Sequence, residues 1–215
     1  MGARHAKLGR CAKARMSATR PAMMDRVFEA SAETLPPAYP FALWAELVRH
    51  VPQLAGDESV GVLPLRTAES GADLLLPRRA KLVLRLPQTL TQAAAALSGA
   101  SLDIAGSTLR LGISQPRQMQ PHPTLHARLV TGADDEVAFM EEMRASLSAM
   151  GIEAGLICGR SASLVQAGRA LTGYSLVVHD LRPEASLRLQ SAGMGEGRHF
   201  GCGIFVPYKV ISGLT

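Results

Sequence analysis

Aromatic residues and cysteines are scarce in this chain of 215 residues. Only 4% of the residues are aromatic although 47% are hydrophobic, so the core must be built mainly from Leu, Val, Ala and Met. The three cysteines, Cys11, Cys158 and Cys202, are scattered along the chain without metal-ligand spacing. Reduced thiols in a cytosol explain this pattern better than a disulfide framework does. We therefore expect a cytoplasmic protein and assign its cysteines no chemistry.

Long apolar runs are missing as well. No run reaches the ~18 to 20 residues that a membrane span needs, and the N-terminus lacks the apolar region of a secretory signal. We therefore expect a protein that is neither secreted nor bound to a membrane. No histidines and carboxylates are spaced as metal ligands, and we predict neither a metal nor another cofactor.

Positive charge is concentrated at the N-terminus. Residues 1–23 hold six Lys or Arg and no acid, so the rest of the chain has a net charge of −1 although the whole chain has +5. Three explanations fit such a segment: a basic arm that binds RNA, a cleaved organellar leader, or a translation start assigned upstream of the true one at Met23 or Met24. We favour a disordered tail without a defined role.

The chain from residue 24 to 116 alternates strand and helix patterns. Apolar and polar residues alternate over 24–31, and Phe41, Trp44 and Val51 recur at helical spacing over 39–51. Further strands are expected at 58–67, 80–87 and 107–114, with a polar connection at 68–79 and an Ala-rich helix at 88–100. The resulting order is β-α-β-β-α-β.

The second half of the chain repeats this order. Strands are expected at 124–132, 154–159, 174–181 and 202–211, and helices at 133–151 and 182–193. We therefore predict an α+β fold of two tandem ferredoxin-like (RRM-like) β-α-β-β-α-β modules. The modules span residues 24–116 and 117–215 and are joined at the proline-rich SQPRQMQPHP.

A glycine-rich run, GMGEGRHFGCGIF at residues 193–205, lies between the last expected helix and strand and holds five glycines within eleven residues. Dinucleotide-binding glycines precede a helix instead, and a phosphate-binding P-loop would end in GK followed by Ser or Thr. A backbone without side chains can approach a polyanion closely, and Arg198 and His199 could add charge and hydrogen bonds. A phosphodiester backbone fits this description, with a flexible connection as the alternative interpretation.

The segment SLRLQSAGMGEGRHFGCGIFVPYK resembles the C-terminal glycine-rich loop of the CRISPR repeat-processing endoribonucleases of the RAMP superfamily. The segments GVLPLRTAESGADLLLPRRAKLVLRLP, PTLHARLV and LICGR are similar to the MYXAN subtype of that family. The resemblance covers roughly residues 28 to 211 and implies tandem ferredoxin-like modules. It also implies binding of the repeat hairpin of precursor CRISPR RNA, one metal-independent cut, and other subunits of an effector complex as further candidate partners.

Metal-independent RNA cleavage requires a base for the 2′-hydroxyl proton, an acid for the leaving 5′-oxygen, and cations at the phosphate. The expected products are a 2′,3′-cyclic phosphate and a 5′-hydroxyl. The resemblance implies a catalytic histidine near the first helix, where Tyr39 stands in its place. A tyrosine with a pKa of ~10 is a poor base, although it can orient a hydroxyl. His50 is the other catalytic candidate, and an interaction with the helix end is its alternative role.

The remaining histidines rank lower. His122 and His126 flank an expected strand and His179 ends another, where ordinary surface or core positions explain them. RNA contacts are expected from basic side chains and from the glycine-rich run, because RNA hairpins are recognised mainly through phosphates, 2′-hydroxyls and shape. The expected RNA-binding residues are Arg66, Arg78, Arg79, Lys81, Arg160, Gly193, Gly195, Gly197, Arg198, His199, Gly201 and Gly203.

Three functions are compatible with these patterns. The first is an endoribonuclease that makes mature guide RNAs, and the second is a non-catalytic subunit that holds the hairpin, as the tyrosine at position 39 suggests. The third is an unrelated two-module protein that binds a small ligand or regulates another protein. The clustering of arginine and glycine favours the first two.

Overall fold

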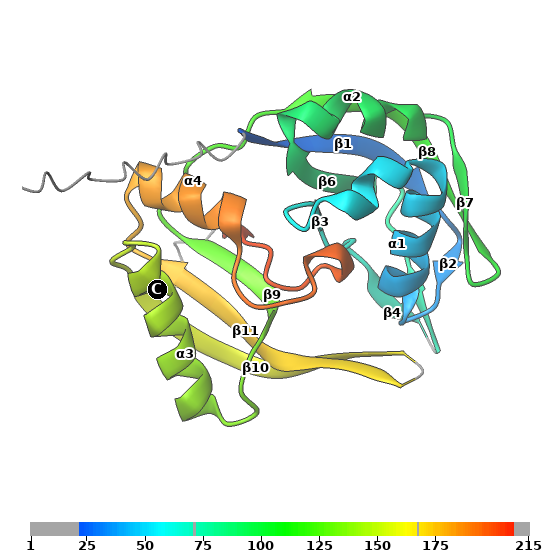
Figure 1. The fold of residues 1–215 in the computed structure, drawn as a ribbon. Helices are drawn as coiled ribbons and strands as arrows, with labels where there is room; N and C mark the ends of the chain where they lie inside the picture. Colours follow the sequence, from blue (N-terminus) through cyan, green and yellow to red (C-terminus); the bar gives the residue numbers. More distant parts are fainter. Residues whose placement is uncertain (1–21, 71, 167, 209–215) are drawn as a thin grey trace, which may run out of the picture.

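The structure, a computed structural model, describes residues 22–70, 72–166 and 168–208 (Figure 1). The expected basic tail lies outside the described residues except for Ala22 and Met23, and Met23 begins strand β1. Residues 209–211 of the last expected strand also lie outside them. In the part of the chain that the structure describes, no helix is long and apolar enough to cross a membrane.

A five-stranded antiparallel sheet in the order β3-β6-β1-β8-β7 forms the N-terminal half. Helix α1 buries Leu43 and Leu47 against the face of the sheet that carries Phe28 and Leu84. The elements are β1 (Met23–Ser31), α1 (Tyr39–His50), η1 (Pro52–Gly56), β3 (Gly61–Val62), β6 (Lys81–Pro87), β7 (Ser101–Ile104) and β8 (Ser107–Arg117). With β7 set aside, β1 lies between β6 and β8 and β3 lies at the edge, which is the arrangement predicted for a ferredoxin-like module.

Several local features of this half differ from the prediction. The expected helix at 88–100 consists of three short turns, η2 (Gln88–Leu90), α2 (Thr91–Ala94) and η3 (Ala95–Leu97). The expected connection at 68–79 contains β4 (Ala68–Ser70) and β5 (Asp73–Leu75), which form a small sheet with β2 (Thr34–Leu35). Elements of two to four residues carry no periodicity that a sequence pattern could reveal. The expected strand at 58–67 is limited to β3, where Pro64 soon follows and cannot donate to a strand ladder.

A four-stranded antiparallel sheet in the order β10-β11-β9-β12 forms the C-terminal half, and it again has the ferredoxin-like order that was predicted. Helices α3 and α4 cover one of its faces, with Phe139 and Leu189 in the shared core (Figure 1). Helix α3 starts where the Asp135 side chain accepts a hydrogen bond of 3.0 Å from the Ala138 N–H. The elements are β9 (Leu125–Thr131), α3 (Glu136–Ala149), β10 (Gly155–Gln166), β11 (Arg169–His179), α4 (Pro183–Ala192), η4 (Arg198–Phe200) and β12 (Val206–Pro207).

The strands of the second sheet have different lengths from those predicted. Strands β10 and β11 form a hairpin that extends well beyond the helices (Figure 1). It includes residues 160–166 and 169–173, which the pattern left between two short strands. Strand β12 is restricted to Val206 and Pro207, while Cys202 to Phe205 are buried outside any strand. The sequence pattern did not reveal the outer hairpin, because it contains small and polar residues such as Ser161 and Ser163. Apolar and polar residues do not alternate where both faces of a strand are exposed.

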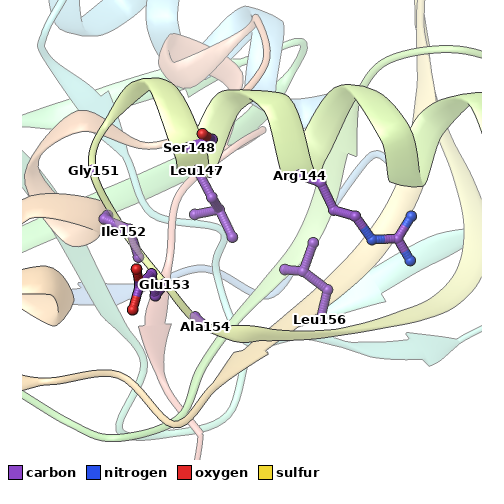
Figure 2. Close-up of a pocket in the computed structure, with 8 residues that line it drawn as sticks. All are labelled: Arg144, Leu147, Ser148, Gly151, Ile152, Glu153, Ala154 and Leu156. Atoms are coloured by element: carbon purple, nitrogen blue, oxygen red, sulfur yellow. The ribbon is translucent and has the colours of Figure 1, made fainter.

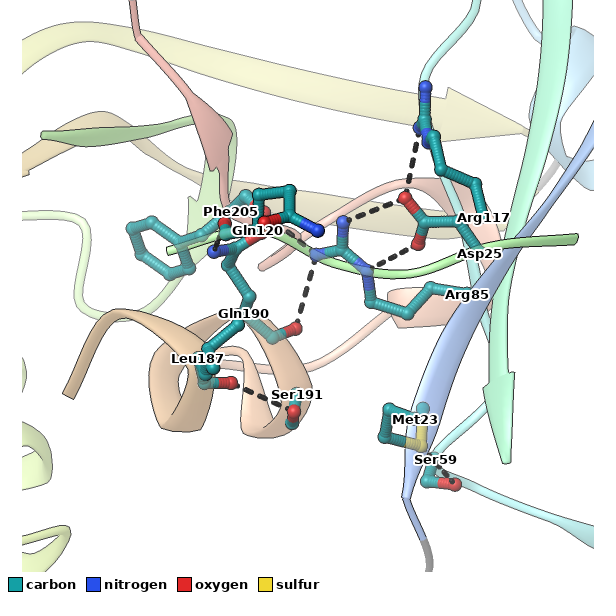
Figure 3. Close-up of polar contacts among 10 residues, drawn as sticks. All are labelled: Met23, Asp25, Ser59, Arg85, Arg117, Gln120, Leu187, Gln190, Ser191 and Phe205. Carbon is teal, nitrogen blue, oxygen red and sulfur yellow. Dashed lines mark hydrogen bonds and ion pairs between the residues drawn. The ribbon is translucent and has the colours of Figure 1, made fainter. Parts of the chain in front are cut away.

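A buried arginine, paired with an aspartate inside the N-terminal sheet, also reaches the C-terminal half (Figure 3). Arg85, only 1% exposed, donates from Nε to Asp25 Oδ1 at 2.8 Å on the neighbouring strand. Its Nη1 donates to the backbone carbonyl of Phe205 at 2.8 Å and to that of Gln190 at 3.1 Å, both in the C-terminal half. Arg117 Nη2 also donates to the Asp25 carboxylate at 2.9 Å. The Arg85 side chain therefore connects the N-terminal sheet to the end of α4, because its N–H groups donate to Asp25 in one half and to backbone carbonyls in the other.

Candidate functional site

The glycine-rich run folds back on itself beside β9. Met194 N–H donates to the Gly203 carbonyl at 3.2 Å, and Gly203 N–H donates to the Leu129 carbonyl at 2.7 Å. The five glycines between residues 193 and 203 all have positive φ, from +64° to +89°. Gly197 and Gly201 are in the left-handed conformation on either side of the η4 turn. The run therefore needs glycine for its own path, whatever else it contacts.

Protein atoms already lie close to all of these glycines. A Cβ on Gly201 would lie 2.9 Å from Pro64 Cγ, and a Cβ on Gly197 would lie 2.8 Å from Leu171 Cδ1. Gly193, Gly201 and Gly203 are buried, whereas Gly195 is exposed. The close backbone approach expected from the sequence is thus present, with the protein itself as the neighbour at all five positions, including Gly195, where a Cβ would meet the Thr131 carbonyl oxygen.

The η4 turn packs the C-terminal half against α1. The His199 ring stacks on Trp44 with centroids 4.0 Å apart, and the Phe200 ring lies 4.7 Å from that of Phe41. Arg198 Nη1 donates to the Ala192 carbonyl at 2.6 Å. Burial is the main cause that lowers the pKa of His199. Arg198 and His199, expected at an RNA backbone, are half-buried at the junction of the two halves.

Tyr39, the first residue of α1, is buried beneath the segment that follows β3. Its Oη accepts a hydrogen bond of 2.9 Å from the Leu65 N–H, and its side chain is part of the N-terminal core. Burial raises the pKa of this phenol above its usual value. The structure therefore places Tyr39 where it supports the Leu65 backbone.

Removing this hydroxyl tests the supporting role. We expect Tyr39→Phe to lower the free energy of unfolding by about 1 to 3 kcal/mol, because the Leu65 N–H would lose its acceptor in a buried place. Tyr174→Phe is a matched control, since that hydroxyl donates to the Asp134 carbonyl at an exposed site, and it should change stability by less than about 0.5 kcal/mol. Urea unfolding measures both values. A loss of RNA cleavage at unchanged stability would instead support the catalytic role expected for Tyr39.

His50 belongs to the last turn of α1, as predicted, and is exposed. Its Nδ1 lies 3.0 Å from the Glu46 carbonyl of the preceding turn. Arg49 forms an ion pair with Glu46 at 2.7 Å, and this partner lowers the pKa of the Glu46 carboxyl to about 2. His50 therefore lies at a helix end, next to the ion pair of Glu46 with Arg49.

The expected RNA-binding cations outside the glycine-rich run are all exposed, and they come from both halves of the chain. Lys81 pairs with Glu29 across β1 and β6 at 3.1 Å. Arg160 belongs to β10 in the C-terminal half, whereas the other cations belong to the N-terminal half. The others lie in the connections around the small sheet: Arg66, Arg78 and Arg79.

The sequence interpretation gave no functional role to one pair of polar side chains on β9. Leu125 and Ala127 are buried in the core, so the intervening His126 emerges on the opposite face of the sheet, with Arg128 two residues further along. Arg128 Nη1 donates to the Leu65 carbonyl at 3.1 Å and so reaches across to the N-terminal half. The alternation in LHARLV could have placed His126 opposite the core, but it could not indicate what that face meets.

The structure contains two shallow hollows away from this pair. One of about 450 Å³ lies between α3 and the start of β10 and is lined by residues including Leu147, Ile152 and Leu156 (Figure 2). The other, of about 330 Å³, lies beside Thr131 and Glu196. Among the described residues no three His, Cys, Asp or Glu side chains gather in a way that could hold a metal ion.

Comparison with known proteins connects this geometry to a family. The family model described as Cas6 Crispr matches residues 24–210. The chain is 37% identical over 186 residues to a protein of Myxococcus xanthus (strain DK1622) named CRISPR-associated endonuclease Cas6. That match covers 86% of this chain and 81% of the relative.

Solved structures share the fold at low sequence identity. One, described as a Cas6-related gene from Pyrococcus furiosus, aligns with a TM-score of 0.65 at 9% identity and covers 86% of this chain and 98% of the other. Another, described as an RAMP protein binding different RNA substrates, also has a TM-score of 0.65, at 12% identity over 86% of this chain and all of the other. The two ferredoxin-like sheets and the glycine-rich run are consistent with the family match, which covers most of the chain. This chain belongs to the Cas6 family.

Proposed function

We propose that this chain is an endoribonuclease that cuts the repeat sequence of precursor CRISPR RNA. The observation that carries the proposal is the 37% identity with a protein named as a CRISPR-associated endonuclease, over 86% of this chain. A structural relative described as binding different RNA substrates supports RNA as the ligand of this fold. Other subunits of an effector complex remain candidate partners.

The reaction that we propose needs no metal ion. The 2′-oxygen attacks the adjacent phosphorus and loses its proton to a base, and the bond from phosphorus to the 5′-oxygen breaks. The products are a 2′,3′-cyclic phosphate and a 5′-hydroxyl. Cationic side chains neutralise the charge that gathers on the phosphate. His50 and Tyr39 are the candidates that the sequence offers for the proton transfers.

RNA contacts are proposed for the exposed cations and for the exposed part of the glycine-rich run. Arg66, Arg78 and Arg79 lie in connections of the N-terminal half, where long side chains can reach phosphates and 2′-hydroxyls of a hairpin. Arg160 occupies the exposed hairpin of the C-terminal half. In the glycine-rich run, Gly195 has an exposed backbone, whereas contacts by Arg198 or His199 would require the η4 turn to open.

A second function, a subunit that holds the hairpin without cutting it, is favoured by the position of Tyr39. Its hydroxyl is buried and already bonded to Leu65 N–H, so the place where the family resemblance implies a catalytic histidine holds a group that cannot accept a proton near neutral pH.

Cleavage of the host's repeat RNA in excess EDTA separates these functions. We expect cleavage to persist under chelation and to disappear when a single 2′-deoxy sugar replaces the ribose at the cut site, because that sugar lacks the attacking oxygen. End-group analysis of the products should find the cyclic phosphate. Tight binding without cleavage would favour the hairpin-holding subunit, and loss of cleavage in EDTA would contradict the metal-independent reaction.

A further inference from the structure

One row of side chains crosses the face of the second sheet that α3 and α4 leave uncovered. His126 on β9 stands opposite Val177 of β11 on one side and Val206 of β12 on the other. Val177 in turn pairs with Ile157 of β10, whose side chain is 55% exposed. Because paired residues in antiparallel strands point to the same side of the sheet, these four side chains form one surface. His126 is the only member of the row that can transfer a proton.

A cation is held beside this histidine. Arg128 lies two residues further along β9, where the pairing of this strand with β11 shifts register, and its positive charge acts on the His126 ring. Its Nη1 donates to the Leu65 carbonyl at 3.1 Å, and the Leu65 N–H is bonded to the buried Tyr39 Oη. The guanidinium is thus tied to a backbone segment of the N-terminal half that is itself fixed. The site lies where the two halves meet.

His126 differs from the other histidines of the described residues in the state of its ring. The Nδ1 atoms of His50, His122 and His179 lie 2.8 to 3.0 Å from the Glu46 carbonyl, the Thr124 carbonyl and the Asp180 carboxylate, respectively. The Nε2 atom of His199 is fully buried. Within the described part of the chain, neither ring nitrogen of His126 is hydrogen-bonded or among the fully buried unpaired atoms, so both reach solvent.

Burial and a nearby positive charge both favour the neutral form of the His126 ring. Burial is the larger cause and the positive charge of Arg128 the smaller one that together lower its pKa below the ordinary value of 6.5. The ring of Tyr208 lies 5.4 Å away, and its side chain is 44% exposed. The neighbours on the adjoining strands, Val177 and Val206, carry no charge. Near neutral pH the ring can therefore accept a proton and does not begin with one.

We propose that His126 is the catalytic base of the RNA cleavage and that Arg128 binds the phosphate that is cut. The assignment rests on the proposed endoribonuclease function. A ring nitrogen of His126 takes the proton of the 2′-hydroxyl as the bond from the 2′-oxygen to phosphorus forms. The bond from phosphorus to the 5′-oxygen breaks, the leaving oxygen takes a proton from a water molecule, and the hydroxide that remains recovers the proton from the His126 ring. The open apolar row of Ile157, Val177 and Val206 offers a surface for the nucleotide beside the cut.

The assignment predicts how cleavage depends on pH. The active form is the neutral ring, so cleavage falls as pH decreases through the lowered pKa of His126 and becomes independent of pH above it. A base with an ordinary or raised pKa would place this fall at a higher pH. The charged groups that bear on the ring are Arg128 on its own strand and any phosphate that binds, and a bound phosphate would raise the pKa in the complex.

The test compares two histidines of the same sheet under single-turnover conditions with the repeat RNA. We expect His126→Ala to cut at least ~100-fold more slowly than the unaltered chain while binding the hairpin with similar affinity. His179→Ala is the matched control, because this histidine ends β11 and its ring pairs with Asp180, and it should cut normally. Added imidazole should restore part of the activity of His126→Ala, since it can replace the missing base. His126→Gln, which keeps a polar side chain, should also be inactive.

Each other outcome would overturn the assignment. If His126→Ala cuts normally while His50→Ala does not, the base is the histidine expected from the sequence. If His126→Ala loses activity together with hairpin binding, and imidazole restores nothing, His126 has a structural role. If the unaltered chain binds the hairpin but does not cut it, the proposed function fails and the assignment fails with it. Circular dichroism of each variant identifies a failure to fold, in which case His126→Gln decides.

Discussion

Arg85→Ala is expected to lower the free energy of unfolding by about 3 to 5 kcal/mol. The change removes the main partner of the buried Asp25 carboxylate and leaves the carbonyls of Gln190 and Phe205 without their donor (Figure 3). Both effects act in the same direction, because a buried charge and buried acceptors that lose their partners cannot regain water. Urea or thermal unfolding of the purified protein measures the loss.

Two variants show whether burial causes this effect. Arg117→Ala removes the other cation on the same Asp25 carboxylate, but this side chain is 55% exposed, so we expect a loss of about 1 kcal/mol or less. The pair Arg85→Met with Asp25→Leu removes both buried charges together and should recover much of the stability that Arg85→Ala loses. Equal losses for Arg85→Ala and Arg117→Ala would contradict the buried-pair explanation.

Gly203→Ala is expected to lower the free energy of unfolding by about 2 to 5 kcal/mol, which combines left-handed strain with steric overlap. Gly203 has a φ of +64°, and a Cβ there would overlap the Met194 carbonyl oxygen. The Met194 backbone has little freedom to move away, because its N–H donates to the Gly203 carbonyl and the Gly203 N–H donates to the Leu129 carbonyl. The affected contact is between backbone atoms, and no flexible side chain can yield.

Gly106→Ala is the control for Gly203→Ala. Gly106 has a φ of +88° in the turn between β7 and β8, with no atom within 4 Å of the place a Cβ would take. It should therefore lose only the conformational part, about 1 to 2 kcal/mol. The difference between the two variants in urea unfolding measures the steric part. If both variants lose the same stability, the close packing of the glycine-rich run has no energetic weight and its glycines are required only for their dihedrals.

Much of the fold could be predicted from the chain, because long periodic segments carry their own signal. The alternation in AKLVLRLP and TLHARLVTG identified β6 and β9, and the acids ahead of FMEEM predicted a helix from residue 133, three residues before α3 begins. The repeated β-α-β-β-α-β order then restricted the topology to the strand orders that both sheets have. The strands and turns that were missed are too short or too polar for periodicity, as in β4, β5 and the outer part of the β10 hairpin.

The candidate site was harder to predict from sequence patterns than the fold. Tyr39 and His50 were identified from their place on the first helix, but neither pattern nor resemblance indicated that Tyr39 would be buried against Leu65. His126 and Arg128 lie two residues apart on β9, yet the sequence contains nothing that states which side of this strand the helices cover. That depends on how α3, which follows β9 directly, and α4, which follows only after the β10–β11 hairpin, pack against the sheet.

Local backbone preference and hydrophobic period depend only on neighbouring residues, so the amino-acid sequence was sufficient to determine the two ferredoxin-like modules and the need for glycine after α4. The contacts between the halves depend on residues that are far apart in the chain. Arg85 meets Phe205, Trp44 meets His199, and Arg128 meets Leu65 only because the two sheets pack together. The tertiary structure therefore decided that the glycine-rich run packs against the protein and that a histidine and an arginine lie at the open junction. The reason is that burial and charge pairing are properties of assembled surfaces, and no local pattern encodes them.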